Sequence, residues 1–374
     1  MDKRFALFAV IIFIVLLIIL VFVFLILTGT TPQEKEPIKI GFIGPLSGSG
    51  AAWGIEQKNA LDIGIQEINT AGSINDRNLK IIYEDGKCDG KEATIAAEKL
   101  ISVDKVNILM PVCSSETLAV IPIANRNNVL VMAVWPTNPS ISGSGDYIFR
   151  NSYSDNVVGK RMAEIISKNF SHVGVLTELS DYSAGLRDSF KKNFSGEVFE
   201  ENYAPDAKDL RAQLTKLIAS RPDAVLINPN SVATGLVALH QLKELGYNGK
   251  LFGNFFGEST DVIQSPDSNG LIFFADPVVE NNQIKQQLFS KYISIYGKKP
   301  DFEFAVSAEY DSIHILAQAL ENVGDEPPKL KDYLHSMPSF SGVLGTYHFD
   351  SNGDATGFVP AVKQILNGNV VLVQ

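Results

Sequence analysis

The sequence lacks the residue patterns that usually carry catalysis or bind a metal. Its five histidines lie far apart and show no H-x-x-x-H or similar ligand spacing, so we expect no metal site. Neither a G-x-S-x-G elbow nor a G-x-x-x-x-G-K-[ST] loop occurs, which removes the common sequence signals of serine hydrolases and P-loop NTPases. We therefore predict a protein that has no catalytic residues and is not an enzyme.

Positive charge is sparse as well. The formal net charge is −10, and the basic residues form no stripe along the chain, which argues against nucleic acid as a partner. A dinucleotide fingerprint begins at Gly48-Ser49-Gly50, but Trp53 occupies the position where close packing needs the third glycine. We expect no cofactor.

One long apolar run opens the chain. Residues 5–27 are continuously apolar, which at helical rise matches the thickness of a bilayer core, and Lys3 and Arg4 before them predict a cytoplasmic N-terminus. A cleaved signal peptide is the alternative, but the run is long for one and lacks an A-x-A-like cleavage site. We predict a single-pass signal anchor in the cell membrane, a tether at residues 28–37 and an extracytoplasmic remainder.

Only two cysteines occur, Cys88 and Cys113, and both follow the predicted membrane span. In an extracytoplasmic compartment disulfides persist, so the two cysteines are expected to pair. The alternative is two unrelated buried thiols.

From residue 38 onward, strand-like apolar runs alternate with segments of helical period. After the run 38–43 and a loop rich in Gly and Ser, Leu61, Gly64, Ile65 and Ile68 recur at helical spacing. This alternation is typical of parallel sheets covered by helices on both faces. We predict strands at residues 38–43, 79–84, 106–112, 129–134, 172–178, 197–203, 224–229, 251–256 and 271–275.

The length of the chain exceeds what one hydrophobic core usually holds, so the series should divide into two α/β lobes. Helical patterns return at residues 283–296 and 304–322, before short strands at 347–349, 362–366 and 370–373. In open α/β sheets ligands bind beyond the carboxyl ends of the strands, so two facing sheets define a cleft between lobes.

Six features together resemble the Leu/Ile/Val-binding protein family, the solute receptors of ABC importers. They are IKIGFIGPLSGSGAAWG, the pair Cys88 and Cys113, PVCSSET, PTNP, DYSAGL and GTYHFDSNGD, in an order that extends from about residue 38 to the C-terminus. The resemblance implies a type I periplasmic-binding-protein fold, in which two Rossmann-like doubly wound lobes are joined by a three-crossover hinge. It also implies a disulfide between the two cysteines.

The resemblance places the crossovers near Asp155, Asp276 and Gly345. We assign residues 38–155 and 277–345 to lobe 1, and residues 156–276 and 346–374 to lobe 2. Such a chain bends at the crossovers and closes on its ligand.

The resemblance also implies binding-site residues. Ser114, with Ser115 beside it, matches the carboxylate-binding serine, and a hydroxyl with free N–H groups at a helix start suits an anion; a plain N-cap is the alternative. Thr137 matches a second polar anchor, or else belongs to a turn. Trp53 matches an aromatic that covers the ligand's apolar part, or is an ordinary core residue. Tyr182 matches the second lobe's tyrosine.

Other positions depart from the family pattern. Phe255 aligns with the glutamate that pairs with the ligand's ammonium, so an amino-acid ligand needs Glu258, Asp181 or another acid in its place. Trp135 falls where the family has a small residue whose backbone binds the amine, and Asn230 falls where it has a second-lobe tyrosine. The carboxylate half of the site is better retained than the amine half.

These observations predict a receptor that delivers an amino acid or related small carboxylate to ABC permease subunits and is held at the membrane by its N-terminal helix. The alternative is a ligand-sensing extracellular domain that acts with a membrane signalling partner. An enzyme is the third class, and the sequence shows no nucleophile–base pair or metal constellation for it.

Overall fold

The computed structural model describes residues 12–21 and 35–373, and the chain divides into two units, Met1–Pro37 and Ile38–Gln374. In the first unit, residues 12–21 are helical, and every one of them is apolar. Within the described ranges, no helix has both the length and the apolar character to cross a membrane. The predicted anchor and tether extend outside the described residues, so both stay predictions.

The first sheet of the second unit contains five parallel strands in the order β2-β1-β3-β4-β5. The strands are β1 (Ile38–Gly44), β2 (Leu79–Asp85), β3 (Ile108–Pro111), β4 (Leu130–Val134) and β5 (Ile148–Asn151). Every residue of β3 and β4 is buried, as expected where helices cover both faces of a parallel sheet. The helices between these strands are α2 (Ala51–Ala71), α3 (Gly90–Ser102) and α4 (Ser114–Asn127).

The second sheet has seven strands in the order β14-β13-β10-β9-β8-β6-β7. The parallel strands are β6 (His172–Glu178), β7 (Glu197–Tyr203), β8 (Ala224–Asn228), β9 (Lys250–Gly253) and β10 (Ile272–Pro277). Two antiparallel strands, β13 (Pro360–Leu366) and β14 (Asn369–Leu372), complete one edge. The helices of this sheet are α5 (Asp155–Ile166), α6 (Asp181–Asn193), α7 (Arg211–Ala219), α8 (Val232–Glu244) and α9 (Thr260–Gln264).

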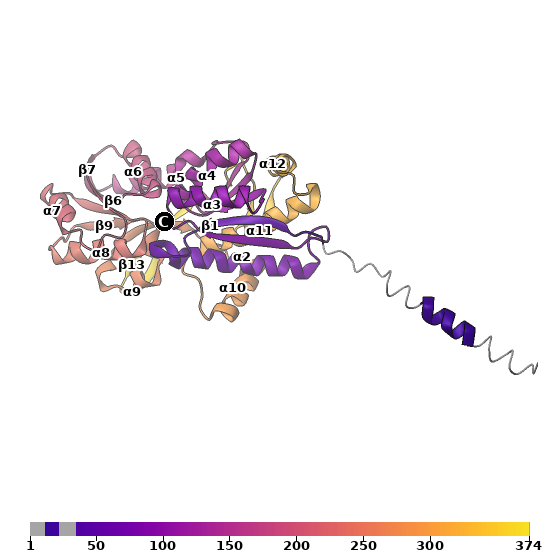
Figure 1. The fold of residues 1–374 in the computed structure, drawn as a ribbon. Helices are drawn as coiled ribbons and strands as arrows, with labels where there is room; N and C mark the ends of the chain where they lie inside the picture. Colours follow the sequence, from indigo (N-terminus) through magenta and orange to yellow (C-terminus); the bar gives the residue numbers. More distant parts are fainter. Residues whose placement is uncertain (1–11, 22–34, 374) are drawn as a thin grey trace, which may run out of the picture. The chain divides into compact units, whose positions relative to one another are not determined.

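Three later helices return to the first sheet: α10 (Gln283–Tyr296), α11 (Glu303–Val323) and α12 (Pro327–Ser336). The first two contact α2, and α12 contacts β4. A two-stranded sheet of β11 (Phe340–Gly342) and β12 (Gly345–Tyr347) follows, and the chain then enters β13. The chain thus passes between the sheets after β5, β10 and β12. In Figure 1, β6, β7, β9 and β13 lie toward the left of the second unit, and β1 lies toward its right with α2, α3 and α4. The lobe limits assigned by residue number stay a prediction.

Some elements differ from the sequence prediction. Neither β5 nor α12 was expected, and β3 is shorter than the predicted run 106–112. The predicted strand 251–256 ends early, because the chain turns into a 3₁₀ helix at η3 (Phe255–Glu258). Further 3₁₀ turns lie at η1 (Gly48–Gly50), η2 (Pro139–Ile141) and η4 (Pro266–Ser268).

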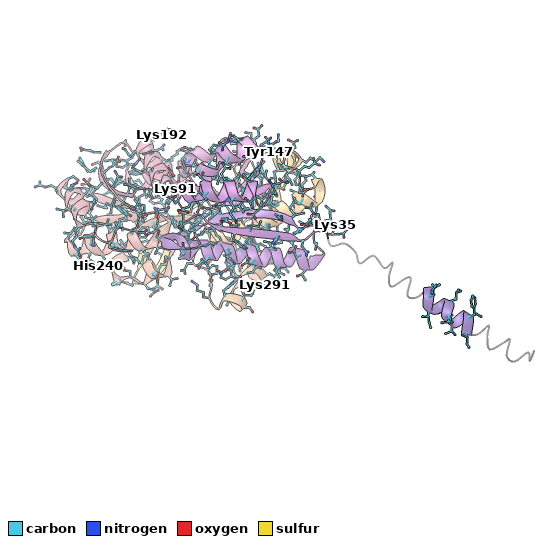
Figure 2. The ribbon with its side chains drawn as sticks, in the orientation of Figure 1. Lys35, Lys91, Tyr147, Lys192, His240 and Lys291 are labelled. Atoms are coloured by element: carbon cyan, nitrogen blue, oxygen red, sulfur yellow. A yellow bond between two sulfur atoms is a disulfide. The ribbon has the colours of Figure 1, made fainter. Side chains whose placement is uncertain are left out.

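Three labelled lysines of the second unit lie apart from one another in Figure 2. The labelled Lys91, Lys192 and Lys291 lie on three different helices, α3, α6 and α10 (Figure 2).

Candidate functional site

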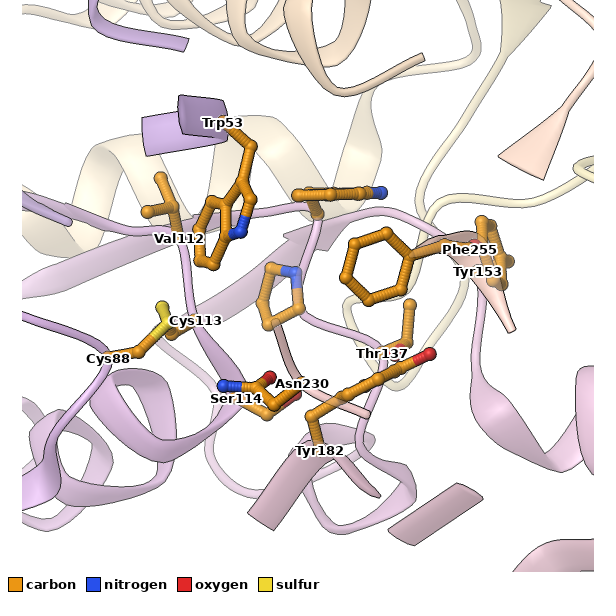
Figure 3. A pocket seen from close by; sticks show the side chains of 12 residues that line it. Trp53, Cys88, Val112, Cys113, Ser114, Thr137, Tyr153, Tyr182, Asn230 and Phe255 are labelled. Atoms are coloured by element: carbon orange, nitrogen blue, oxygen red, sulfur yellow. A yellow bond between two sulfur atoms is a disulfide. The ribbon is translucent and has the colours of Figure 1, made fainter. Parts of the chain in front are cut away.

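A cavity lies where the carboxyl ends of parallel strands from both sheets meet, and Figure 3 shows its lining side chains. Its lining residues are Trp53, Cys88, Val112, Cys113, Ser114, Trp135, Pro136, Thr137, Tyr153, Tyr182, Asn230 and Phe255. Each of them follows β1, β2, β3, β4, β5, β6, β8 or β9 in the sequence, which is where open α/β sheets bind ligands. About 40 Å³ is open to water-sized molecules, so a larger ligand requires side chains or lobes to move apart.

The start of α4 forms one wall of the cavity. Ser114 is its first residue, and the preceding Cys113 is the N-cap. The Ser114 side chain is 3% exposed, and its hydroxyl accepts a hydrogen bond of 3.3 Å from the backbone N–H of Asn138. Because the first N–H groups of a helix have no intrahelical acceptor and carry partial positive charge, this wall suits a carboxylate.

A disulfide and a buried glutamate hold this wall. Cys88 and Cys113 form a disulfide with a Cα–Cα distance of 5.4 Å. The Glu116 carboxyl accepts hydrogen bonds from the backbone N–H groups of Cys88 at 2.9 Å and Cys113 at 3.1 Å. Burial raises the pKa of Glu116 to about 8, although these N–H donors oppose the shift. The two sulfurs and the carboxyl oxygen also lie within 4.8 Å of one another, but sulfurs bonded to each other are not the thiolates that bind metals.

Aromatic rings form much of the remaining lining. The ring of Trp135 lies 5.4 Å from Trp53 and 5.1 Å from Phe255, both in edge-to-face contact. Phe255 in turn lies 5.4 Å from Tyr182. Figure 3 shows Trp53 and Tyr182 on opposite sides of the lining group. Such rings suit the apolar part of a ligand.

Trp135 is also held by a carboxylate behind the lining. Its indole N–H lies 3.1 Å from each carboxyl oxygen of Asp276, and the hydroxyl of Tyr153 donates to the same carboxylate. Burial raises the pKa of Asp276, while the hydrogen bonds from Tyr153 and Trp135 oppose the shift. The backbone of Trp135 has a φ of 76°, a conformation that is an outlier for a bulky residue.

Thr137 is tied to the start of α5. Its hydroxyl donates to a carboxyl oxygen of Asp155 at 2.9 Å, and its backbone carbonyl accepts from the Asp155 N–H at 2.8 Å. Burial raises the pKa of Asp155 to about 7, against the opposing effects of the Thr137 hydroxyl and Arg150. Since the proton of the Thr137 hydroxyl is directed to Asp155, the lone pairs of its oxygen remain for a ligand.

The model of the periplasmic binding protein family matches residues 37–361 of this chain. The chain belongs to the periplasmic binding protein family. It is 26% identical over 334 residues to the leucine-, isoleucine-, valine-, threonine- and alanine-binding protein of Pseudomonas aeruginosa, which covers 86% of this chain and 88% of that protein. It is 27% identical over 325 residues to a Leu/Ile/Val-binding protein of Rhizobium johnstonii, with 79% and 86% covered.

Solved structures of periplasmic binding proteins agree with this assignment. A leucine binding protein from Thermotoga maritima has a TM-score of 0.81 at 25% identity and covers 90% of this chain and 98% of its own. A branched-chain amino acid substrate binding protein of Streptococcus pneumoniae, crystallised with isoleucine, has a TM-score of 0.78 at 25% identity, with 90% and 99% covered. The resemblance to the Leu/Ile/Val-binding protein family is confirmed, and so is the two-lobed α/β fold.

The cavity of this periplasmic binding protein brings together six of the eight residues predicted for the site. They are Trp53, Ser114, Trp135, Thr137, Tyr182 and Asn230, and their roles toward a ligand stay predictions. Ser115 and Glu258 do not line the cavity. The Glu258 carboxyl instead forms an ion pair of 2.6 Å with Lys363 of β13, because η3 directs it to that side of the second sheet. Burial raises the pKa of Glu258, and Lys363 opposes this.

Sequence reasoning missed three residues that shape the site. Asp276 was expected only as a crossover position, and Tyr153 and Glu116 were not singled out. The sequence does carry a signal for Glu116, since an acid three residues after an N-cap is typical of a capping box. No local pattern indicates that Asp276 faces Trp135, because 141 residues separate them.

Proposed function

We propose that this chain is the extracytoplasmic substrate-binding protein of an ABC importer and captures a small amino acid or related carboxylate by closing two lobes around it. The observation that carries the proposal is the cavity, because it joins the N-terminus of α4 from the first sheet to side chains from the second. The leucine-, isoleucine-, valine-, threonine- and alanine-binding relative and the structure crystallised with isoleucine support the same class of ligand.

A ligand that contacts residues of both lobes should stabilise the closed form of the protein. Ser114 and Thr137 follow strands of the first sheet, whereas Tyr182 and Asn230 follow strands of the second. A ligand that contacts both pairs binds the closed arrangement better than an open one, so it shifts the population toward closure. The closed form is then the signal that permease subunits recognise.

Isothermal titration calorimetry tests the proposal. The purified full chain is titrated with aliphatic, aromatic and polar amino acids and with the corresponding acids that lack the amino group. We expect one-site binding of at least one carboxylate ligand, together with a smaller radius of gyration in X-ray scattering when that ligand is bound. Tight binding of a neutral compound without a carboxylate, with no response to any acid, contradicts the proposal.

The same proposal includes a membrane anchor at residues 5–27, the N-terminal apolar run, followed by a tether at residues 28–37. The helix of residues 12–21 supports it, since a helix that is apolar on all sides is typical of a membrane span or a buried core. Membrane fractionation and the intact mass of the purified protein test this; a mature chain that begins near Thr30 contradicts it.

A further inference from the structure

The lining of the cavity carries no charged side chain. None of its twelve residues, all in the described part of the chain, is an aspartate, glutamate, lysine, arginine or histidine. The neutral acceptors in the lining include the Thr137 hydroxyl oxygen and the Asn230 side-chain carbonyl. A carboxylate ligand can be held at the start of α4, but an ammonium enclosed here would have no carboxylate partner, which is costly in a desolvated site.

Two carboxylates lie behind the lining, and both already have donors; Asp155 receives the hydroxyl of Thr137. Both oxygens of Asp276 receive the indole N–H of Trp135, and one of them also receives the Tyr153 hydroxyl. Trp135 and Tyr153 line the cavity, whereas Asp276 does not and is 1% exposed. The indole N–H of Trp135 thus occupies the carboxylate oxygens of Asp276 that the ammonium of an amino acid would otherwise bind.

A second tryptophan presents an unused donor to the cavity. Trp53 is 3% exposed, and its indole nitrogen is buried without a hydrogen-bond partner among the described residues. In Figure 3 this nitrogen is turned toward the interior of the lining group. Because an indole N–H can only donate, and buried donors are normally satisfied, a ligand oxygen is its natural partner.

We infer that the site is specific for an organic acid without an amino group, in which Trp135 covers Asp276 and the donors of Trp53, Ser114 and α4 hold the carboxylate. This inference rests on the proposed function and narrows its ligand class to aliphatic or aromatic monocarboxylates. The ring contacts of Trp53, Trp135 and Phe255 favour an apolar remainder on the acid.

Matched ligand pairs test the inference on the unmodified full chain. Leucine is compared with 4-methylpentanoate, and phenylalanine with 3-phenylpropanoate, by calorimetry at one pH and salt concentration. In the better-bound pair we expect the amine-free acid to have a dissociation constant at least tenfold lower than the amino acid. A smaller difference or a preference for the amino acid overturns the inference and leaves the proposed function standing. Absence of binding by amino acids and acids alike contradicts both.

Two tryptophan variants locate the selectivity. Trp135→Phe keeps a ring but removes the N–H that covers Asp276, so the preference for the acid should fall by at least tenfold as the carboxylate becomes available to an ammonium. Trp53→Phe, the matched control, removes the donor that faces the ligand and should weaken both members of a pair alike. An unchanged preference in a folded Trp135→Phe protein overturns the role of Trp135, and circular dichroism verifies folding.

Discussion

Replacing Ser114 by alanine removes the hydroxyl from the wall that we expect to hold the ligand's carboxylate. In the structure this hydroxyl already accepts the N–H of Asn138, so its own proton is free to be donated to a ligand oxygen. The substitution therefore deletes one donor from the seat while the N–H groups at the start of α4 remain. Ligand binding should weaken without being abolished.

The magnitude follows from the kind of bond that is lost. A hydrogen bond to a charged group contributes about 1.5–3 kcal/mol, which corresponds to a rise in dissociation constant of roughly 10- to 150-fold. Stability should fall as well, because the substitution leaves the backbone N–H of Asn138 without its Ser114 acceptor. Such a loss costs about 1–3 kcal/mol at most where water cannot replace the acceptor.

The adjacent serine supplies a matched control. Ser115 lies one position later on α4 and does not line the cavity, so Ser115→Ala makes the same chemical change outside the site. Calorimetry with the best-bound acid should show weaker binding for the Ser114 variant and a value within about threefold of the unmodified protein for the Ser115 variant. Equal effects of the two substitutions would refute the assignment of Ser114 to the carboxylate seat.

Three further predictions concern stability. Reduction of the disulfide between Cys88 and Cys113, whose sequence separation is 25, should cost about 3.5 kcal/mol and lower Tm by about 5 °C in calorimetry; two free thiols in the non-reduced protein would contradict this. Folding raises the pKa of Glu116 from 4.5 to about 8. Between these two pH values the native state keeps a proton that the unfolded chain releases. The free energy of unfolding therefore falls as pH rises from 4.5 to 8, by up to about 1.4 kcal/mol per pH unit. The stability of the Glu116→Gln variant, measured by urea unfolding, should therefore rise relative to that of the unmodified protein between pH 5 and pH 8. If the difference in stability between the two proteins does not change with pH, the raised pKa of Glu116 is contradicted. Arg150, 1% exposed, donates two hydrogen bonds to Asp354 at 2.9 and 2.7 Å, so Arg150→Met should cost about 3–5 kcal/mol; a double variant with Asp354→Leu should lose less than the sum, and strict additivity would argue against the pair.

The strands that sequence could predict are those with continuous apolar runs. β1 and β8 are buried along most or all of their length, and their Ile, Val and Leu content reports this directly. β5 gives no such signal, because Arg150 occupies a buried position in a strand of only four residues. Its partner Asp354 lies 204 residues away, and no local pattern in the sequence reveals that the two side chains meet.

In the candidate site, too, some residues can be predicted from the neighbouring sequence, whereas others are oriented by residues far along the chain. Ser114 was predicted from the resemblance, and its place after a strand and before a helix agreed with an anion site, but the predicted site also included Ser115. Successive helical residues point about 100° apart, so only one of the two was able to face the cavity. Glu258 is close to Phe255 in sequence, yet its direction depends on the turn of η3 and on Lys363, which is 105 residues further along.

The backbone of Trp135 links the fold to the choice of ligand. A φ of 76° in a residue with a large side chain costs on the order of 1–3 kcal/mol and persists only where the surroundings fix it. Here the indole N–H is held by Asp276, and the ring packs against Trp53 and Phe255. Glycine would relieve the strain, but it would uncover Asp276 and enlarge the cavity. The strained tryptophan is therefore better explained by exclusion of an ammonium from the cavity than by a contribution to stability.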